Sequence, residues 1–423
     1  MKADTSDFRL EAESGRAGQL RRLFDVAVAS THPAQVMAVH LPTAPAGRCV
    51  VVGAGKAAAS MAAVVERAWP GVALSGVVAV PYGFAVPLDR IKVLEAAHPV
   101  PDENSVLAGR AIMDAVIGLS STDLVLGLFS GGGSSTMVLP AIGLSLEDKR
   151  QVNMRLLDSG LDIRTINSVR RRLSAIKGGR LAAAAAPAFV FTLAISDIPG
   201  DDVAAIASGP TIFDDKPVDV SAIVTGLGGA FPEAVMRLLT EPASDPITVP
   251  SQYRMVATPA IALDAAAREA ASLGINPVVL ADDVEGASHE VAARMAQVVE
   301  KARSGPTVIL SGGETTVSLE SGCRGRGGRN TEFLLALALE LDKAGVAPVW
   351  ALSADTDGID GNAGGAGAII TPDTLARARA LGLDPARCLE RHDSATFFDA
   401  LGDLLVTGPT HTNVSDFRAI LVT

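Results

Sequence analysis

One repeated pattern restricts the fold of this chain. A short, apolar, β-branched run is followed at once by a polar loop rich in glycine or aspartate, and each run predicts a buried strand. Stretches with apolar residues at helical spacing lie between these runs, so an α/β fold with mainly parallel, doubly covered sheets is expected. Ligands bind such sheets beyond the carboxyl ends of the strands. The four polar loops, which should line one or two ligand sites, span residues 130–135, 196–202, 311–314 and 353–358.

Chain length and a proline-rich segment predict two domains. At 423 residues the chain is long for one hydrophobic core. Residues 242–250 carry three prolines and no periodicity, so we expect a boundary there, between a domain of residues 1–240 and a domain of residues 255–423. Ser145, followed three residues later by Asp148, predicts a helix start. The expected strands are 49–53, 75–81, 92–95, 123–129, 191–195, 277–280, 307–310, 349–352 and 418–422.

Composition argues against several classes of partner. A net charge of −11 and an aromatic content of 4% disfavour nucleic-acid binding, which needs a basic surface or stacking rings. Three cysteines without paired spacing give no disulfide or zinc framework. The longest mainly apolar run, residues 181–195, is too short to span a bilayer, and the first residues lack a signal peptide's apolar segment. We therefore expect a cytoplasmic monomer or homodimer without membrane or nucleic-acid partners.

The turn Gly53-Ala54-Gly55-Lys56 follows an expected strand and opens a helix. A Walker loop would need glycine at position 50 and serine or threonine at 57, where the chain has valine and alanine. A dinucleotide fingerprint fits loosely through Gly53 and Gly55, but it would place an acid at the end of the next strand, where residues 79–82 offer none. We favour a helix N-terminus with Lys56 beside it, both directed at phosphate, over a packing turn with a solvated lysine.

Two Ser-Gly-Gly loops are candidates for binding anions. The first has three glycines and three hydroxyls, enough for a nest of backbone N–H groups, although a simple tight turn is the alternative. The second precedes Arg329 and a helix over residues 331–340, so an anionic ligand is expected there, with a glycine-rich surface hairpin as the alternative. The residues concerned are Ser130, Gly131, Gly132, Gly133, Ser134 and Ser135 in the first loop and Gly312, Gly313 and Glu314 in the second.

Charged residues near the other strand ends complete the candidates. Asp197 directly follows a strand, where a carboxylate can hold Mg²⁺ or accept a hydroxyl proton. Asp355 and Asp357 lie in a loop that lacks the ligands of a calcium-binding EF-hand but suits metal or hydroxyl recognition. Lys177 belongs to a basic run that is either a solvated helix face or an anion clamp. His98 lacks metal-ligand spacing, so a core or capping role is expected for it.

At these residues the chain resembles the class II glycerate 2-kinase family, whose C-terminal part is the MOFRL domain. The resemblance covers nearly the whole chain, and the combination of motifs is far more specific than any one glycine loop. The matching stretches are VVGAGKAAASM (51–61), AAHPVPDENS (96–105), LFSGGGSS (128–135), NSVRRRLSAIKGGRLA (167–182), ISDIPGDD (195–202), SGGETTV (311–317), GRGGRNTEF (325–333), SADTDGIDG (353–361) and TGPTHTNVSD (407–416).

The resemblance implies ATP- and Mg²⁺-dependent phosphorylation of D-glycerate to 2-phosphoglycerate. It implies a cleft between a Rossmann-like N-terminal α/β/α domain and a C-terminal MOFRL-type α/β domain, with Lys56 and Arg329 as the active-site cations. Phosphoryl transfer needs positioning and neutralisation of oxygen charge, which a compact lysine and a forked arginine can supply. Asp197 is the expected Mg²⁺ ligand or base, with Glu314, also a candidate metal ligand, and Asp355 as second choices. The alternatives are an NAD(P)H-dependent hydroxypyruvate reductase, a label that some family members carry, and a non-enzymatic sensor of a sugar-acid phosphate.

Overall fold

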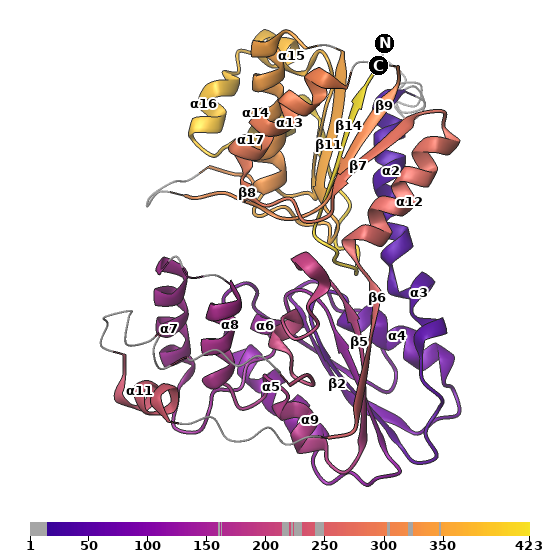
Figure 1. The fold of residues 1–423 in the computed structure, drawn as a ribbon, viewed down its shortest axis with the longest axis vertical. Helices are drawn as coiled ribbons and strands as arrows, with labels where there is room; N and C mark the ends of the chain where they lie inside the picture. Colours follow the sequence, from indigo (N-terminus) through magenta and orange to yellow (C-terminus); the bar gives the residue numbers. More distant parts are fainter. Residues whose placement is uncertain are drawn as a thin grey trace, which may run out of the picture. The chain divides into compact units, whose positions relative to one another are not determined.

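The computed structural model describes residues 15–159, 161, 163–213, 220, 223, 231–241, 249–302, 305–319, 325–346 and 348–423. These residues form two compact units (Figure 1). One unit is Pro33–Val256, and the other joins the N-terminal segment up to His32 to Ala257–Thr423. Most of the expected boundary at residues 242–250 lies outside the described residues.

A six-stranded sheet in the order β3-β2-β1-β4-β5-β6 forms the centre of the Pro33–Val256 unit. The four pairings from β3 to β5 are all parallel, as the sequence predicted. This is the strand order of dinucleotide-binding α/β domains, so the Rossmann-like expectation is confirmed for this unit. The strands are β1 (Cys49–Ala54), β2 (Leu74–Pro81), β3 (Lys92–Ala96), β4 (Leu124–Phe129), β5 (Phe189–Ile195) and β6 (Ser251–Ala257).

Helices α5 and α7 of this unit begin at side-chain caps. Every residue of β1 and β4 is buried, as expected of strands covered on both faces. The side chain of Ser145 accepts the backbone N–H of Asp148, and Asp148 accepts that of Ser145, so the predicted helix start is confirmed. The helices are α3 (Pro33–Val36), α4 (Ala58–Ala68), α5 (Glu103–Ala115), α6 (Gly133–Thr136), α7 (Leu146–Asp158), α8 (Ile163–Arg172), α9 (Arg180–Ala185) and α11 (Glu233–Thr240).

The centre of this sheet is a topological switch point. Strands β1 and β4 are neighbours, but the chain continues from β1 through β2 to β3 on one side and from β4 to β5 on the other. Loops that leave a sheet in opposite directions open a crevice beyond the carboxyl ends of their strands. The Gly55-Lys56 turn follows β1 and the Ser130–Ser135 loop follows β4, so both border this crevice.

The second unit contains a mixed sheet in the order β13-β12-β11-β14-β9-β7. Strands β7 and β9 pair in parallel, whereas the other four pairings are antiparallel. The expectation of a mainly parallel sheet is therefore corrected for this unit: β12 and β14 are entered through loops rather than helical crossovers. The strands are β7 (Asn276–Ala281), β9 (Thr307–Ser311), β11 (Val349–Asp355), β12 (Gly367–Ile370), β13 (Leu404–Leu405) and β14 (Asp416–Val422), with a small two-stranded sheet of β8 (Gly286–Ala287) and β10 (Thr315–Thr316).

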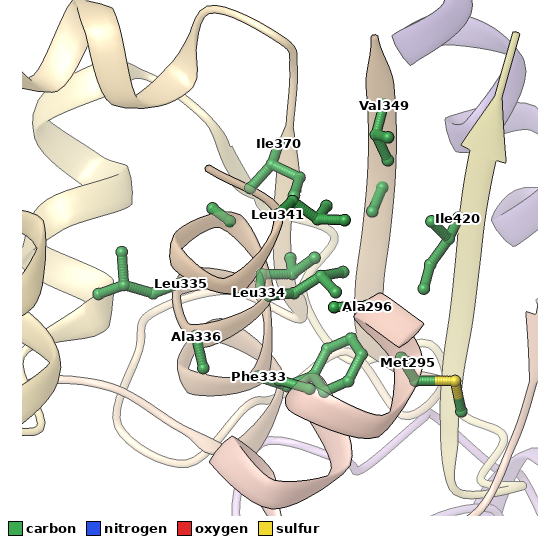
Figure 2. Packing of buried hydrophobic residues seen from close by; sticks show 14 of the residues in the cluster. Met295, Ala296, Phe333, Leu334, Leu335, Ala336, Leu341, Val349, Ile370 and Ile420 are labelled. Carbon is green, nitrogen blue, oxygen red and sulfur yellow. The ribbon is translucent and has the colours of Figure 1, made fainter. Parts of the chain in front are cut away.

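Helix α14 (Arg329–Ala344) organises the core of this second unit. Figure 2 shows Phe333, Leu334 and Leu341 of α14 in one cluster with Val349 of β11 and Ile420 of β14. Residues 330–338 of α14 are all buried, so this helix lies inside the unit rather than on its surface. None of the described helices is long and apolar enough to cross a membrane. The other helices of the unit are α2 (Arg16–Thr31), α12 (Pro259–Ser272), α13 (Ser288–Lys301), α15 (Thr374–Ala380), α16 (Pro385–Glu390) and α17 (Ser394–Leu401).

Helix α2 changes the expected division of the chain. The sequence placed it in a domain of residues 1–240, but it packs on α12, β11 and β14 of the C-terminal unit. Its apolar stripe, which includes Leu23 and Phe24, is buried there, and the Phe24 ring meets Phe417 edge-on at 5.9 Å between centroids. The hydroxyl of Thr412 also donates to the Thr31 carbonyl. Burial of this stripe, rather than order along the chain, assigns α2 to its unit.

Candidate functional site

The turn after β1 packs directly on the loop after β4. Gly55 has a φ of +122°, and a Cβ there would lie 2.4 Å from both the carbonyl and the hydroxyl oxygen of Ser130. The Lys56 N–H donates to the Gly131 carbonyl at 2.9 Å, and the Ala57 N–H donates to Ser130 Oγ at 3.0 Å. A Cβ at Gly53 would lie 2.3 Å from the Leu128 carbonyl. Close packing therefore explains both glycines, and the backbone donors of this turn point into the protein rather than at a ligand.

The Ser130–Ser135 loop has the geometry of an anion nest. Gly132 adopts a left-handed conformation (φ +82°) and Gly133 begins helix α6, a combination that turns successive N–H groups toward one point. The amides of Gly131 and Gly132 donate to no acceptor in the described part of the chain. The loop is braced from behind by a 2.7 Å hydrogen bond between the hydroxyls of Ser134 and Ser208. These two amides are thus available to an anion at the switch point.

Lys56 and His98 lie against the same glycine of this nest. A Cβ built on Gly132 would be 3.5 Å from Cγ of Lys56 and 3.5 Å from Nδ1 and Cε1 of His98. Nδ1 of His98 is hydrogen-bonded to Ser135 Oγ at 2.7 Å. His98 is an exposed residue, so the core alternative expected from the sequence is corrected. The sequence feature that could have identified His98 as a site residue is its place just after β3, at the same sheet edge as the other strand-end loops.

Lys177 supports this loop from inside the protein. Its side chain is only 4% exposed, and its ammonium group donates to the Ser134 carbonyl at 2.6 Å. Burial, together with the nearby cations Lys149 and Arg170, holds the pKa of Lys177 well below its usual value. Asp197 is half-buried just beyond β5, the strand that neighbours β4, so its carboxylate lies at the same sheet edge. The structure thus brings Lys56, Asp197 and the Ser130–Ser135 loop to one edge and sets Lys177 behind them.

In the second unit, Arg329 is surrounded by carboxylates. Its Nε lies 2.8 Å from Asp416 and its terminal nitrogens lie 2.5 Å from Asp355 and 3.2 Å from Glu314. Burial alone would lower the pKa of Arg329, but the Asp416, Asp355 and Glu314 carboxylates outweigh it and raise the pKa well above its ordinary value. Its side chain keeps 22% exposure, so two of its five N–H donors can still face a ligand.

Asp416 and Arg418 were missed by sequence reasoning. Strand β14 runs antiparallel between β9 and β11, which sets Asp416 opposite Asp355 and Arg418 opposite Ser311. The buried Arg418 guanidinium donates to Asp416 at 2.6 Å and to the Gly312 carbonyl at 2.7 Å. The only local signal was the polar run at residues 411–416 before an apolar strand. These bonds tie the 311–314 loop to β14.

The N-terminus of α14 is occupied by the protein's own carboxylate. Oδ1 of Asp360 accepts the Asn330 N–H, and Oδ2 accepts the N–H and hydroxyl of Thr331. Burial nevertheless raises the pKa of Asp360 to about 6, although the amides of Asn330 and Thr331 lower it. The expectation that this helix end awaits an anionic ligand is therefore corrected: Asp360 already takes its donors.

The remaining acids of this edge are also engaged. Glu314 is half-exposed beside Arg329, whereas Asp355 and Asp357 are buried. Asp355 Oδ1 accepts the Asp357 N–H, and Asp357 Oδ1 accepts the Ile359 N–H at 2.7 Å. Among the described residues, no three acidic, histidine or cysteine side chains converge as a metal site. A Mg²⁺ ion would therefore need oxygens from a substrate or water, which is its usual preference.

Comparisons with known proteins match two segments of the chain. Residues 19–240 match a domain of unknown function, DUF4147, and residues 307–416 match the MOFRL family. A D-glycerate 2-kinase of Thermotoga maritima is 34% identical over 397 residues, which cover 92% of this chain and 94% of that protein. The chain belongs to the MOFRL-domain glycerate kinase family. It is thus an enzyme of that family, and the crystal structure of a T. maritima glycerate kinase superposes with a TM-score of 0.84 at 33% identity, covering 96% of this chain and 99% of that one.

Other members of the family carry two kinds of name. The human glycerate kinase is 34% identical over 496 residues, covering 98% of this chain and 94% of the human protein. A protein of Agrobacterium vitis is 52% identical over 412 residues, covering 95% of this chain and 94% of the relative, and its name is a provisional one, hydroxypyruvate reductase. Family membership alone therefore leaves the reaction to be argued from the site.

Proposed function

We propose that this chain transfers the γ-phosphoryl group of ATP to the 2-hydroxyl of D-glycerate, giving 2-phosphoglycerate and ADP. The observation that carries the proposal is the pair of Gly131 and Gly132 amides beside Lys56 at the switch point of the parallel sheet. Backbone N–H groups and a lysine ammonium are the usual partners of phosphate oxygens. The names of relatives from T. maritima, Pyrococcus horikoshii and human support the same acceptor.

We assign phosphate binding to the Ser130–Ser135 loop. The Gly131 and Gly132 amides fix oxygen positions, while Lys56 neutralises the charge that spreads over the phosphoryl oxygens during transfer. Lys177 acts indirectly, because its buried ammonium holds the Ser134 carbonyl. The hydroxyl of Ser130 is committed to the Ala57 amide, so this serine braces the loop.

Asp197 is the proposed Mg²⁺ ligand. It ends the strand next to the phosphate loop, and a single carboxylate with phosphate oxygens and water suits this ion. When bound, Mg²⁺ supplies charge neutralisation between the β- and γ-phosphates. Glu314 remains a second candidate, because its half-exposed carboxylate lies at the edge of the Arg329 cluster.

Arg329 is the proposed partner of the glycerate carboxylate. Its planar guanidinium is fixed by Asp355, Asp416 and Glu314, so its remaining donors are presented in one orientation. Gly312, Gly313 and the buried Asp355 and Asp357 then shape this edge rather than touch the ligand.

The reductase alternative lacks a cofactor site in this geometry. The backbone donors of the turn after β1, which would hold a pyrophosphate, donate to Ala79, Gly131 and Ser130 instead. Strand β2 ends in Pro81 without the acid that binds a ribose. Two relatives named provisionally as hydroxypyruvate reductases nevertheless make the reductase the activity to test against.

The test is a coupled assay with purified protein, ATP, Mg²⁺ and D-glycerate. Enolase converts 2-phosphoglycerate directly, whereas 3-phosphoglycerate needs a mutase first, so enolase alone should report product. Chelation of Mg²⁺ should abolish the signal. NADH oxidation with hydroxypyruvate and no ATP would establish the reductase instead. Thermal stabilisation by ligands without ADP release would indicate a sensor.

A further inference from the structure

Two contacts of Ser135 favour one tautomer of His98. The hydroxyl of Ser135 is placed to donate its single hydrogen to the Gly132 carbonyl, 3.0 Å away. The same oxygen lies 2.7 Å from His98 Nδ1, where a hydroxyl that donates to Gly132 can only accept, so this arrangement assigns the N–H to Nδ1. In the neutral ring Nε2 is then the proton acceptor. Because the Ser135 hydroxyl accepts the hydrogen on Nδ1, the basic nitrogen of the ring is Nε2.

The imidazole ring that carries this base lies beside the proposed phosphate groups. The face of Gly132 contacts both the His98 ring and the Lys56 stem, and the Gly132 amide belongs to the nest. Lys56 contacts the same face of Gly132, and two charged residues bond to the chain near His98: Asp102 accepts the Ala97 N–H, and Arg150 donates to the Pro101 carbonyl. A hydroxyl group brought to a phosphoryl group in this nest would meet an imidazole nitrogen at the same loop.

We propose that His98 is the general base of the reaction, which rests on the phosphoryl transfer proposed above. As the acceptor oxygen bonds to the γ-phosphorus, the bond from that phosphorus to the β,γ-bridging oxygen breaks, and ADP leaves. The hydroxyl proton moves to Nε2 of His98, which becomes an imidazolium. Ser135 acts as a positioning residue, because its hydroxyl holds Nδ1 protonated and the ring in place. Asp197 is then left for the metal rather than for the proton.

The His98→Asn variant removes the base but keeps the hydrogen bond to Ser135. The asparagine amide can still donate to Ser135 Oγ, as Nδ1 does, but it offers no basic nitrogen at the Nε2 position. We expect kcat to fall about 10²–10³-fold with a nearly unchanged KM for glycerate. The loss of activity at acidic pH that comes from protonating the imidazole should disappear in this variant. His289→Asn, at an exposed histidine on α13, is the matched control and should leave both unchanged.

Ser135→Ala tests the positioning step. It keeps the imidazole but frees its tautomer, so activity should fall by a smaller factor, about 10-fold. Nitrogen-15 NMR of the ring should show a hydrogen on Nδ1 in the wild type at neutral pH and a mixture of tautomers in Ser135→Ala.

The outcomes separate this inference from the proposed function. Wild-type protein that is inactive in the enolase-coupled assay would sink the proposed kinase. Normal turnover in His98→Asn within an active enzyme would overturn the general base alone. A wild-type ring with its hydrogen on Nε2 would also overturn the inference, whatever reaction the enzyme catalyses.

Discussion

Two Ser-Gly-Gly loops that look alike in the sequence differ in what their backbones do. After β4, the Gly131 and Gly132 amides donate to no acceptor in the described chain, and the side chains of Lys56 and His98 lie against Gly132. After β9, the Gly312 N–H donates to Ala281, the Gly312 carbonyl accepts from Arg418, and the Gly313 carbonyl accepts from Asp416. The first loop therefore has N–H donors for a ligand, whereas the polar groups of the second loop bond to other residues of its own unit.

The cations beside the two loops differ in the same way. Lys56 lies over the nest, in a loop braced by hydroxyls and main chain. Each nitrogen of Arg329 lies within hydrogen-bonding or ion-pair distance of a carboxylate. A glycine-rich loop is therefore a ligand site only when its neighbours leave its amides unpaired, and the same motif otherwise serves as a joint between strands.

The largest expected effect is on stability, from Arg329→Ala. Removing the guanidinium leaves the buried Asp355 carboxylate without its counter-charge, which should cost about 3–5 kcal/mol of unfolding free energy. Urea unfolding of the variant and the wild type measures this loss of unfolding free energy.

Arg329→Lys should lose nearly as much activity as Arg329→Ala, because lysine keeps the charge but lacks the planar fork of donors.

Arg326→Ala is the matched control for Arg329. Arg326 pairs with Asp399 where both side chains are largely exposed, so its removal should change stability by less than about 1 kcal/mol. Equal stability of Arg329→Ala and wild type would show that the carboxylate cluster is not a structural joint.

Lys56→Ala should show the opposite behaviour, with severe loss of turnover and an intact fold. One well-placed charge at a phosphoryl group is worth about 10²–10³ in rate. The measurements are kcat in the enolase-coupled assay and Tm. A folded variant with near-wild-type turnover would remove Lys56 from the mechanism.

The glycines themselves give a paired comparison. A Cβ at Gly313, where φ is +90°, would lie 2.2 Å from the Val284 nitrogen, so Gly313→Ala should cost about 2–3 kcal/mol in stability. A Cβ at Gly132 has only ordinary contacts at 3.5 Å, so Gly132→Ala should cost about 1–2 kcal/mol through its φ of +82°. Gly132→Ala should reduce activity more than it reduces stability. Similar stability losses in both variants would erase the distinction between the loops.

A pH dependence of stability is expected at the helix end beside the second loop. Because the folded pKa of Asp360 is raised from 3.8 to about 6, the folded state binds this proton more tightly than the unfolded state. The stability that it contributes is therefore complete below about pH 4 and lost as the pH rises through about 6. Relative to Asp360→Asn, wild type should lose up to about 1.4 kcal/mol per pH unit across that window. Urea titrations at several pH values would show this, and a rise with pH would contradict it.

The sequence predicted local elements better than long-range meetings. All nine expected strands form, because apolar β-branched runs bounded by polar loops mark them directly. Five described strands were missed, β6, β8, β10, β12 and β13: Ser251–Ala257 is largely polar, and the other four are only two to four residues long. Nothing local shows that β14 enters between β9 and β11, so the mixed sheet could not be foreseen.

The same limit applies to the sites. Lys56 and the Ser130–Ser135 loop were predicted because each follows its own strand. His98 and Asp416 were not, because their roles depend on Ser135 and Arg329, which lie far along the chain. Lys177 was expected either on a solvated helix face or in an anion clamp, but the fold buries it and directs its amino group at the Ser134 carbonyl. Residue type predicts which chemical groups are available, whereas burial decides what those groups contact.

The placement of α2 has a consequence for synthesis on the ribosome. The helix emerges early, but its partner strand β11 begins at Val349, more than 300 residues later. At about 5–20 residues per second, that delay is about 15–60 s. The Pro33–Val256 unit can complete its own core within that time, while the apolar stripe of Leu20, Leu23 and Phe24 stays uncovered. The nascent chain must therefore keep helix α2 shielded until its partners in the C-terminal unit have been made.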